Sequence, residues 1–182
     1  MRIVSGKLKG RIIHPPKNFK VRPTTDMAKE ALFNVLMHNY SLDNIRVLDL
    51  FGGTGNISYE FASRGAQQVT TIERNYQHFK YIQQTIKELH LEDTIEVKKA
   101  DVFMWLKRAT QAYDIVFADP PYDLPVLESL PQSILEAKIL KQSGLLIIEH
   151  PVEYNFSGLK GFKEQRKYGK VNFSLFESYA EV

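Results

Sequence analysis

The sequence predicts an α/β fold built around a doubly wound, mostly parallel sheet. Three observations support this prediction: short apolar segments recur along the chain, helix-like segments separate them, and an acidic side chain follows several of them. Repeated strand–helix units imply parallel strands joined by right-handed crossovers. The 182 residues, of which 43% are hydrophobic, suffice for one such domain and a small addition.

The N-terminal region is expected to form a short hairpin and then a helix. Residues 2–14 can pair around Lys7-Leu8-Lys9, and two prolines end the pairing. Residues 23–26 offer hydroxyls and a carboxylate that can cap the first turn of a helix ending near Tyr40. The apolar face of this helix is predicted to consist of Ala28, Ala31, Leu32, Val35 and Leu36.

From residue 45 onward, strands and helices alternate. The expected strands are 46–50, 68–72, 94–98, 114–118 and 145–148. The expected helices are 56–64, 76–89, 102–107 and 126–136. Residues 163–168 and 172–177 flank Gly169-Lys170, which predicts a closing antiparallel hairpin.

Composition excludes several kinds of chemistry. The chain has no cysteine, which excludes disulfides, thiolate metal sites, iron–sulfur clusters and the cysteine nucleophile of carbon-directed pyrimidine methylation. The five histidines are scattered without ligand spacing, so no metal site is expected. No apolar run approaches the roughly 20 residues of a membrane span, and the N-terminus lacks the apolar stretch of a signal peptide. A cytoplasmic location is expected.

The turn Asp119-Pro120-Pro121-Tyr122 is the strongest functional signal. It follows an apolar strand, and two prolines cannot continue a central strand because neither has an N–H to donate. The turn therefore exposes a carboxylate, free carbonyls and an aromatic ring at the edge where open α/β sheets bind ligands. These groups suit a planar molecule that bears an amine, whereas an ordinary proline turn is the alternative interpretation.

Four acids stand at or just beyond the ends of successive predicted strands: Asp49, Glu73, Asp101 and Asp119. A doubly wound sheet brings them to one rim. Gly52, Gly53 and Gly55 follow the first acid in a tight turn, but the third glycine of a dinucleotide-binding loop is missing. This acidic rim suits S-adenosylmethionine, which carries an ammonium, a sulfonium and no phosphate. Glu73 can accept from the ribose hydroxyls and Asp101 from the adenine amine; either alone could be a solvated acid or a helix cap.

Methyl transfer to a base amine would explain the Asp119 turn. The lone pair of such an amine is delocalised into the ring, so the nitrogen is a poor nucleophile. The Asp119 carboxylate and the Pro120 carbonyl could accept both N–H bonds and stabilise the charge that develops during attack. Tyr122 could stack on the base, and proton loss needs no dedicated base because the aminium product is acidic.

Across nearly its whole length, the chain resembles the RsmD-type family of class I S-adenosylmethionine-dependent methyltransferases, which methylate the N2 amine of guanine in bacterial small-subunit (16S) ribosomal RNA. The matching segments are residues 1–11, 22–34, 48–55, 63–66, 116–122 and 144–150, with Glu73 and Asp101. The segment 22–34 is specific to this family. Gly53 and Thr54 depart mildly from its pattern, where alanine and serine are common, and residues 160–170 match poorly.

The resemblance implies a Rossmann-like methyltransferase domain, residues 42–182, behind a basic RNA-docking extension, residues 1–41. Residues 1–25 carry a net charge of +7 and the rest of the chain −4, which suits a polyanion, although a solvated extension would show the same charge. The implied catalytic residues are Asp119, Pro120 and Tyr122. The expected cofactor-binding residues are Asp49, Phe51, Gly52, Gly53, Gly55, Glu73, Arg74, Asp101 and Val102. The expected RNA-binding residues are Arg2, Lys7, Lys9, Arg11, Arg22 and Thr24.

The implied partner is ribosomal RNA or an assembling small ribosomal subunit, without a membrane or a metal, and a monomer is favoured. Asp-Pro-Pro-Tyr also occurs in adenine-N6 DNA methyltransferases, so a base amine of DNA or of another RNA stays open as the target. A non-catalytic RNA-binding assembly factor is a second alternative, which the acidic rim disfavours. A small-molecule methyltransferase is a third, which the basic extension disfavours.

Overall fold

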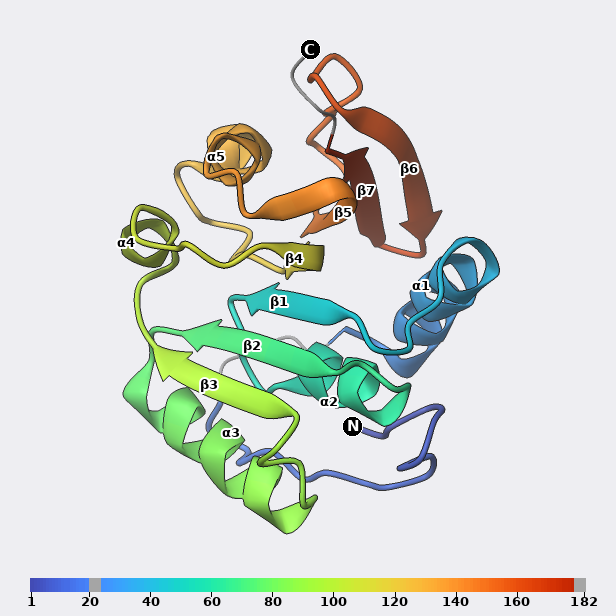
Figure 1. The fold of residues 1–182 in the computed structure, drawn as a ribbon, viewed down its shortest axis with the longest axis vertical. Coiled ribbons are helices and arrows are strands. Elements are labelled where there is room, and N and C mark those ends of the chain that lie inside the picture. The colour runs from blue at the N-terminus through green and yellow to red at the C-terminus, as the bar shows by residue number, and fades with distance from the viewer. Residues whose placement is uncertain (20–23, 179–182) are drawn as a thin grey trace.

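The computed structural model describes residues 1–19 and 24–178, and within them seven strands form one sheet. The sheet order is β3-β2-β1-β4-β5-β7-β6 (Figure 1). The strands are β1 (Arg46–Leu50), β2 (Gln68–Glu73), β3 (Ile95–Lys99), β4 (Tyr113–Ala118), β5 (Leu140–His150), β6 (Phe162–Tyr168) and β7 (Val171–Glu177). The helices are α1 (Asp26–Asn39), α2 (Asn56–Ser63), α3 (Tyr76–Glu88), α4 (Val102–Leu106) and α5 (Leu130–Glu136), the last preceded by a 3₁₀ turn, η1 (Leu127–Ser129).

Strands β1 to β5 pair in parallel, and β7 pairs antiparallel with both β5 and β6. The predicted α/β class, the parallel sheet and the closing hairpin are therefore confirmed. The chain order reverses direction at β1 and β4, where an open sheet of this kind has its crevice. The carboxyl ends of β1, β2, β4 and β5 consequently meet around one hollow.

Helices cover both faces of the sheet, in three layers. Alternating residues along the strands separate two cores: α1, α2 and α3 pack on one face, and α4 and α5 pack on the other (Figure 1). Val47 and Phe117 belong to the first core, whereas Leu48 and Val116 belong to the second. This alternation follows from the two-residue period of a strand.

Side chains cap the first turn of three helices; the caps of α1 and α4 were predicted, whereas that of α3 was not. The Thr25 hydroxyl accepts from the N–H of Ala28 at α1. The Asn75 amide oxygen accepts two N–H groups at α3, and Asp101 does the same at α4. Each cap satisfies backbone donors that have no partner within the helix.

The clearest differences from the predictions are at β5 and at the N-terminal hairpin. Strand β5 begins at Leu140, five residues before its expected start, because the polar residues Lys141 to Ser143 extend it at the exposed end. The N-terminal hairpin is reduced to one isolated bridge, between Arg2 and Ile12, with a few neighbouring backbone hydrogen bonds.

The buried face of α1 is rotated from the predicted one. Lys29 and Phe33 are fully buried, whereas Ala31 and Val35 are only half-buried. A lysine was not expected inside because lysine is almost never fully buried unless it is paired. Here the ammonium of Lys29 lies 3.2 Å from a Glu60 carboxylate oxygen and donates to the Arg2 carbonyl and the Asn56 amide oxygen. Burial lowers the pKa of Lys29, and the negative charge of Glu60 opposes this shift.

The N-terminal segment is part of the structural core. Ile3 and Ile13 are buried in the same cluster as α1 and α2. The backbone N–H groups of Val4 and Ser5 donate to the Glu60 carboxylate at 3.0 and 3.1 Å, and the Leu8 N–H donates to the Ser63 hydroxyl. The basic arm, residues 1–25, is therefore more than an RNA-docking extension because its first residues help to hold the fold together; the division at residues 41 and 42 stays a prediction.

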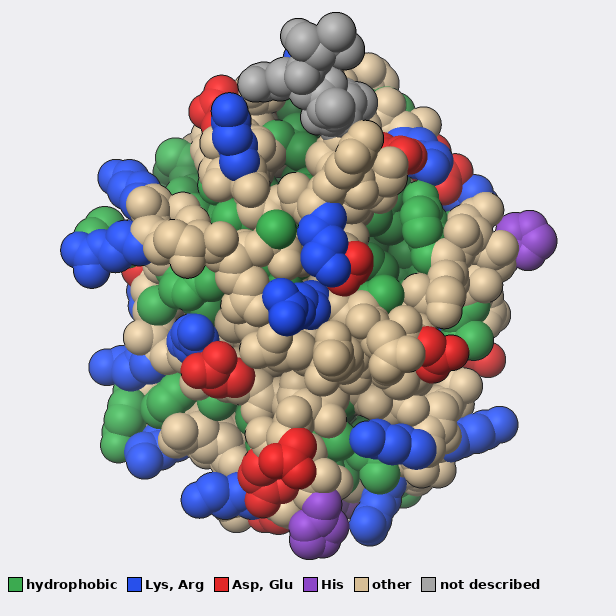
Figure 2. Space-filling model, viewed as in Figure 1, with side chains coloured by type: hydrophobic (Ala, Val, Ile, Leu, Met, Phe, Trp, Pro, Cys, Tyr) green, Lys and Arg blue, Asp and Glu red, His purple; other side chains and the backbone are tan. Residues whose placement is uncertain are grey.

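Charged side chains are mixed on the face shown in Figure 2. Lysines and arginines are spread over that face and around its outline, with acidic side chains between them. This face therefore does not present one continuous basic patch. No helix among the described residues is both long enough and apolar enough to cross a membrane.

Candidate active site

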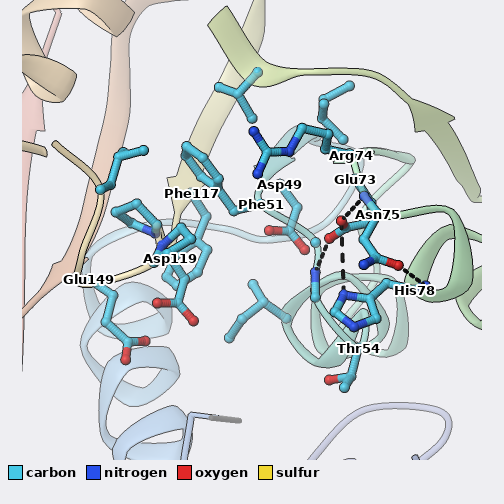
Figure 3. Close-up of a pocket in the computed structure, with 18 of the residues that line it drawn as sticks. Asp49, Phe51, Thr54, Glu73, Arg74, Asn75, His78, Phe117, Asp119 and Glu149 are labelled. Carbon is cyan, nitrogen blue, oxygen red and sulfur yellow. Dashed lines mark hydrogen bonds and ion pairs between the residues drawn. The ribbon is translucent and has the colours of Figure 1, made fainter. Parts of the chain in front are cut away.

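A pocket of about 510 Å³ opens at the carboxyl ends of the parallel strands (Figure 3). All four predicted rim acids, Asp49, Glu73, Asp101 and Asp119, line it. Phe51, Gly52, Gly53, Arg74, Val102, Pro120 and Tyr122 line it as well. The sheet topology thus brings together residues that are up to 73 positions apart in the sequence, as the strand-end argument predicted.

The loop after β1 brings backbone close to the pocket. Gly52 donates to the Ile72 carbonyl at 2.9 Å, and a side chain on Gly52 would meet the Thr71 methyl group at 2.5 Å. Gly55 has φ +79°, a conformation that glycine adopts without strain. Phe51 also has a positive φ, 65°, which is uncommon for an aromatic residue and can persist where the surrounding structure holds it. Neighbouring residues therefore restrict the backbone conformation of this loop.

Asp49 lies at the bottom of the pocket with 2% of its surface exposed. The Ser58 hydroxyl donates to it at 2.5 Å. Burial raises the pKa of Asp49 to about 7; the hydrogen bond from Ser58 opposes this shift and the negative charge of Glu73 adds to it. A buried carboxylate with so little compensation favours a positively charged ligand beside it.

Backbone N–H groups of neighbouring residues hold the Glu73 carboxylate in place. One carboxylate oxygen accepts from the Gly53 N–H at 2.8 Å and the other from the Asn75 N–H at 2.6 Å. His78 lies 3.9 Å from the second oxygen, as the dashed line in Figure 3 marks. The carboxylate therefore has a fixed orientation at the wall of the pocket.

Asp101 caps α4 with one oxygen, which accepts from the Phe103 and Met104 N–H groups. Its other oxygen lies 3.8 Å from the guanidinium of Arg74, whose side chain is 81% exposed. Val102, the next residue, is buried and lines the pocket. Asp101 thus combines the two roles that the sequence left open, a helix cap and a rim acid, while its role toward adenine stays a prediction.

Asp119 lies at the other end of the pocket from Glu73 and Arg74 (Figure 3), and Pro120 and Tyr122 of the same turn also line the pocket. Asp119 directly follows β4 and is partly exposed, and Pro120 is buried. The Tyr122 hydroxyl donates to Glu149 at 3.4 Å. The turn therefore places a carboxylate, a carbonyl and an aromatic ring along one wall.

Sequence reasoning missed several lining residues, of which Glu149 is the most important. Glu149 is 4% exposed and belongs to β5, where it follows the apolar run Leu145 to Ile148. The same strand-end rule that identified the four rim acids applies to it and could have found it. Phe117, Asn56 and His78 also line the pocket, without a comparable sequence signal.

The expected RNA-binding residues lie in different settings. Lys7, Lys9 and Arg11 are exposed, and the Arg2 side chain, 54% exposed, pairs with Asp26 at 3.6 Å. Thr24 is placed differently from this expectation: it is 6% exposed, lines the pocket and donates to Glu149 at 2.8 Å. Its short side chain is used inside the wall instead of on an outer surface. Arg22 lies outside the described residues.

The described residues contain no group of three or more acids or histidines arranged to hold a metal ion.

Comparisons with known proteins identify the family. The family model described as conserved hypothetical protein 95 matches residues 1–177. The chain belongs to this family. It is the RsmD family that the sequence motifs indicated.

Relatives in this family match most of the chain. Ribosomal RNA small subunit methyltransferase D of Escherichia coli (strain K12) is 28% identical, and the match covers 100% of this chain and 91% of the relative. The protein of the same name from Buchnera aphidicola subsp. Acyrthosiphon pisum is 34% identical over 81% of this chain and 76% of the relative. A solved hypothetical protein of Thermus thermophilus is 25% identical, with a TM-score of 0.86 over 97% of this chain and 99% of its own.

Proposed function

We propose that this protein methylates the exocyclic N2 amine of a guanine in small-subunit (16S) ribosomal RNA, with S-adenosylmethionine as methyl donor. One observation carries the proposal: the acidic rim and the Asp119 turn line a single pocket. Relatives that match 76% or more of their own length carry the name ribosomal RNA small subunit methyltransferase D, which supports the RNA substrate.

The pocket fits S-adenosylmethionine in size and in charge. Its volume of about 510 Å³ is within the usual range for small-molecule sites, roughly 300–1,000 Å³. Asp49 is a buried acid whose raised pKa marks a need for a nearby positive charge. When bound, S-adenosylmethionine supplies an electrophilic methyl group on a sulfonium.

The two ends of the pocket would bind different molecules, one end S-adenosylmethionine and the other the target base. Asp49 would neutralise the positive charge of the donor, and Glu73, fixed by Gly53 and Asn75, would accept from ribose hydroxyls. Asp101, beside the buried Val102, would accept from the adenine amine. Phe51, Gly52 and Arg74, which line the pocket, would complete the wall around this ligand, whereas Gly55 does not line the pocket and would shape the loop behind it.

Asp119 and the Pro120 carbonyl would accept the two N–H bonds of the target amine. This arrangement orients the nitrogen lone pair away from the base plane and stabilises positive charge as it develops on nitrogen. Tyr122 would stack on the base, and its hydroxyl makes a long contact with Glu149, at 3.4 Å, that would hold the ring only weakly. The amine loses its proton after attack, when it has become strongly acidic.

The basic arm would hold the RNA. Lys7, Lys9 and Arg11 project from a segment whose backbone is tied to α2, so their charges sit on a fixed support. Contacts of this kind go to phosphates and position the substrate without specifying its sequence.

The test is methylation with an isotopically labelled donor. Unmodified small ribosomal subunits are incubated with the protein, their RNA is digested, and the labelled nucleoside is identified by mass spectrometry. We expect N2-methylguanosine at one position. Large subunits serve as the matched substrate control and Asp119→Ala as the enzyme control. Label in N6-methyladenosine would replace guanine with adenine as the target, and absence of label from every RNA would refute the proposed function.

A further inference from the structure

A second carboxylate lies beside Asp119 in the target end of the pocket. Ala118 of β4 pairs in register with Ile148 of β5, so the next residues along the two strands, Asp119 and Glu149, are neighbours. Both line the pocket, and Figure 3 shows their carboxylates next to each other on the same wall. Asp119 and the Pro120 carbonyl account for both N–H bonds of the target amine, which leaves the Glu149 carboxylate without a role toward the base.

Among the described residues, two hydroxyl groups hold Glu149 in place. The Thr24 hydroxyl donates to one carboxylate oxygen at 2.8 Å, and the Tyr122 hydroxyl donates to the other at 3.4 Å. Thr24 itself is buried next to α1, and its carbonyl accepts from the Asn56 side chain. The carboxylate therefore has a defined orientation at the pocket wall, 4% exposed, before any base enters.

The two purine bases differ in what they offer beside the amine. Next to the N2 amine of guanine stands N1–H, a second donor, whereas next to the N6 amine of adenine stands N1 with a lone pair. Two adjacent carboxylates match two adjacent donors. A carboxylate has about four lone-pair sites, so it can accept a base N–H together with a hydroxyl donor on each oxygen.

Resting on the proposed function, we propose that Glu149 accepts the N1–H of the target guanine and so selects guanine over adenine. Asp119 and Pro120 hold the N2 amine, and Glu149 holds the neighbouring N–H. With adenine, the Glu149 carboxylate faces the N1 lone pair, and two acceptors repel each other in a site with little water. Sites built to hydrogen-bond a substrate reject analogues that lack the donor by large factors, up to about 10⁴–10⁵.

Guanine and 2-aminopurine provide the direct test. 2-Aminopurine keeps the N2 amine but has an N1 lone pair instead of N1–H. Small subunits are reconstituted with RNA that carries either base at the mapped target position, and kcat/KM is measured for each. For the wild type we expect a preference for guanine of about a hundredfold or more.

The variant Glu149→Gln then distinguishes the effect of the N1 contact from the effect of the other differences between the two bases. The glutamine side chain has nearly the same shape, can still accept from Thr24, and offers an N–H₂ group to the N1 lone pair of 2-aminopurine. We expect the preference for guanine to fall by about tenfold or more. The missing O6 of 2-aminopurine affects both enzymes equally, so the change in the ratio reports the N1 contact.

Glu153→Gln is the matched control because it removes an exposed acid four residues further along the chain and lies outside the pocket lining. It should keep the wild-type ratio. Unchanged S-adenosylmethionine affinity in Glu149→Gln would show that the variant is folded. If that folded variant keeps the wild-type preference for guanine, Glu149 only ties Thr24 to the sheet and the inference fails. If the wild type methylates neither base, the proposed function fails instead.

Discussion

The two ends of the pocket are built in different ways. At the end with Glu73 and Asp101, the carboxylates accept N–H groups at most 20 residues away in sequence, and Ser58, nine residues from Asp49, donates to it. At the end with Asp119 and Glu149, the hydroxyl donors to Glu149 are more distant in sequence: Thr24 is 125 residues away and Tyr122 is 27. The first end is therefore organised mainly by backbone N–H groups of the neighbouring loops, and the second by side-chain contacts, one of which spans 125 residues. We expect substitutions at the first end to affect the binding of S-adenosylmethionine and those at the second end to affect methyl transfer.

The largest expected effect is at Asp119. Asp119→Ala should lower turnover by about a hundredfold or more, because it removes a preorganised acceptor for the target amine. Affinity for S-adenosylmethionine should stay near the wild-type value, since the side chain lies at the other end of the pocket. Single-turnover methylation and calorimetry measure the two quantities. Asp123→Ala, which removes an exposed acid four residues later, is the control and should keep full turnover.

Asp49 provides the opposite case. Asp49→Asn should weaken S-adenosylmethionine binding by about 1–3 kcal/mol, the scale for losing a charged partner, and leave turnover at saturating donor largely intact. In the wild type, affinity should rise by up to about tenfold per pH unit as pH approaches 7 from below, because the cationic donor favours ionised Asp49, whose pKa is about 7. Calorimetry across this range measures both effects.

The ligand-free protein supplies a check on the same group. Between the ordinary value of 3.8 and about 7, folded Asp49 holds a proton that the unfolded chain has lost. The free energy of unfolding should therefore fall as pH rises through this window, and Asp49→Asn should remove that fall. An identical pH dependence in wild type and variant would mean that Asp49 is already ionised in the absence of donor.

Tyr122 tests whether the target end acts through its aromatic ring. Tyr122→Ala should reduce RNA-dependent methylation by about 1–3 kcal/mol of transition-state binding, because the variant has no stacking surface. Tyr122→Phe should have a much smaller effect, since the hydroxyl contact with Glu149 is long, at 3.4 Å. The kcat/KM values of the two variants show whether Tyr122 acts through its ring or its hydroxyl. Equal decreases in both variants would mean that the hydroxyl, and not the ring, is required.

The smallest effect per residue is expected on the basic arm. Replacing Lys7, Lys9 and Arg11 with glutamine should weaken RNA binding and reduce the salt slope by about one unit for each phosphate that the arm no longer neutralises. Donor affinity should not change. Filter binding across a salt series measures the slope. The control replaces Lys107, Arg108 and Lys170, three exposed cations elsewhere, and an equally large weakening there would mean that the arm has no special role.

The same contrast explains what the sequence could predict. Asp49, Glu73, Asp101 and Asp119 were predictable because each stands at or just beyond the end of a predicted strand, and a parallel sheet brings such positions to one edge. The place of Thr24 in the pocket was not predictable, because its contact with Glu149 spans 125 residues and leaves no local pattern. The burial of Lys29 was not predictable because a helical lysine is normally solvated; its ammonium is compensated by Glu60 of α2, the Arg2 carbonyl and the Asn56 amide oxygen.

The attachment of the arm to α2 has a consequence for how its role can be mapped. Glu60 is fully buried and depends on the Val4 and Ser5 N–H groups, on Lys29 and on Arg64 to satisfy its charge. Shortening the chain from its N-terminus would strip the first two partners away and leave an under-compensated charge in the interior. In a series of N-terminal truncations, a loss of stability would then be mistaken for a loss of RNA affinity. Side-chain substitutions leave the backbone of residues 3–8 in place, so they distinguish a loss of RNA affinity from a loss of stability.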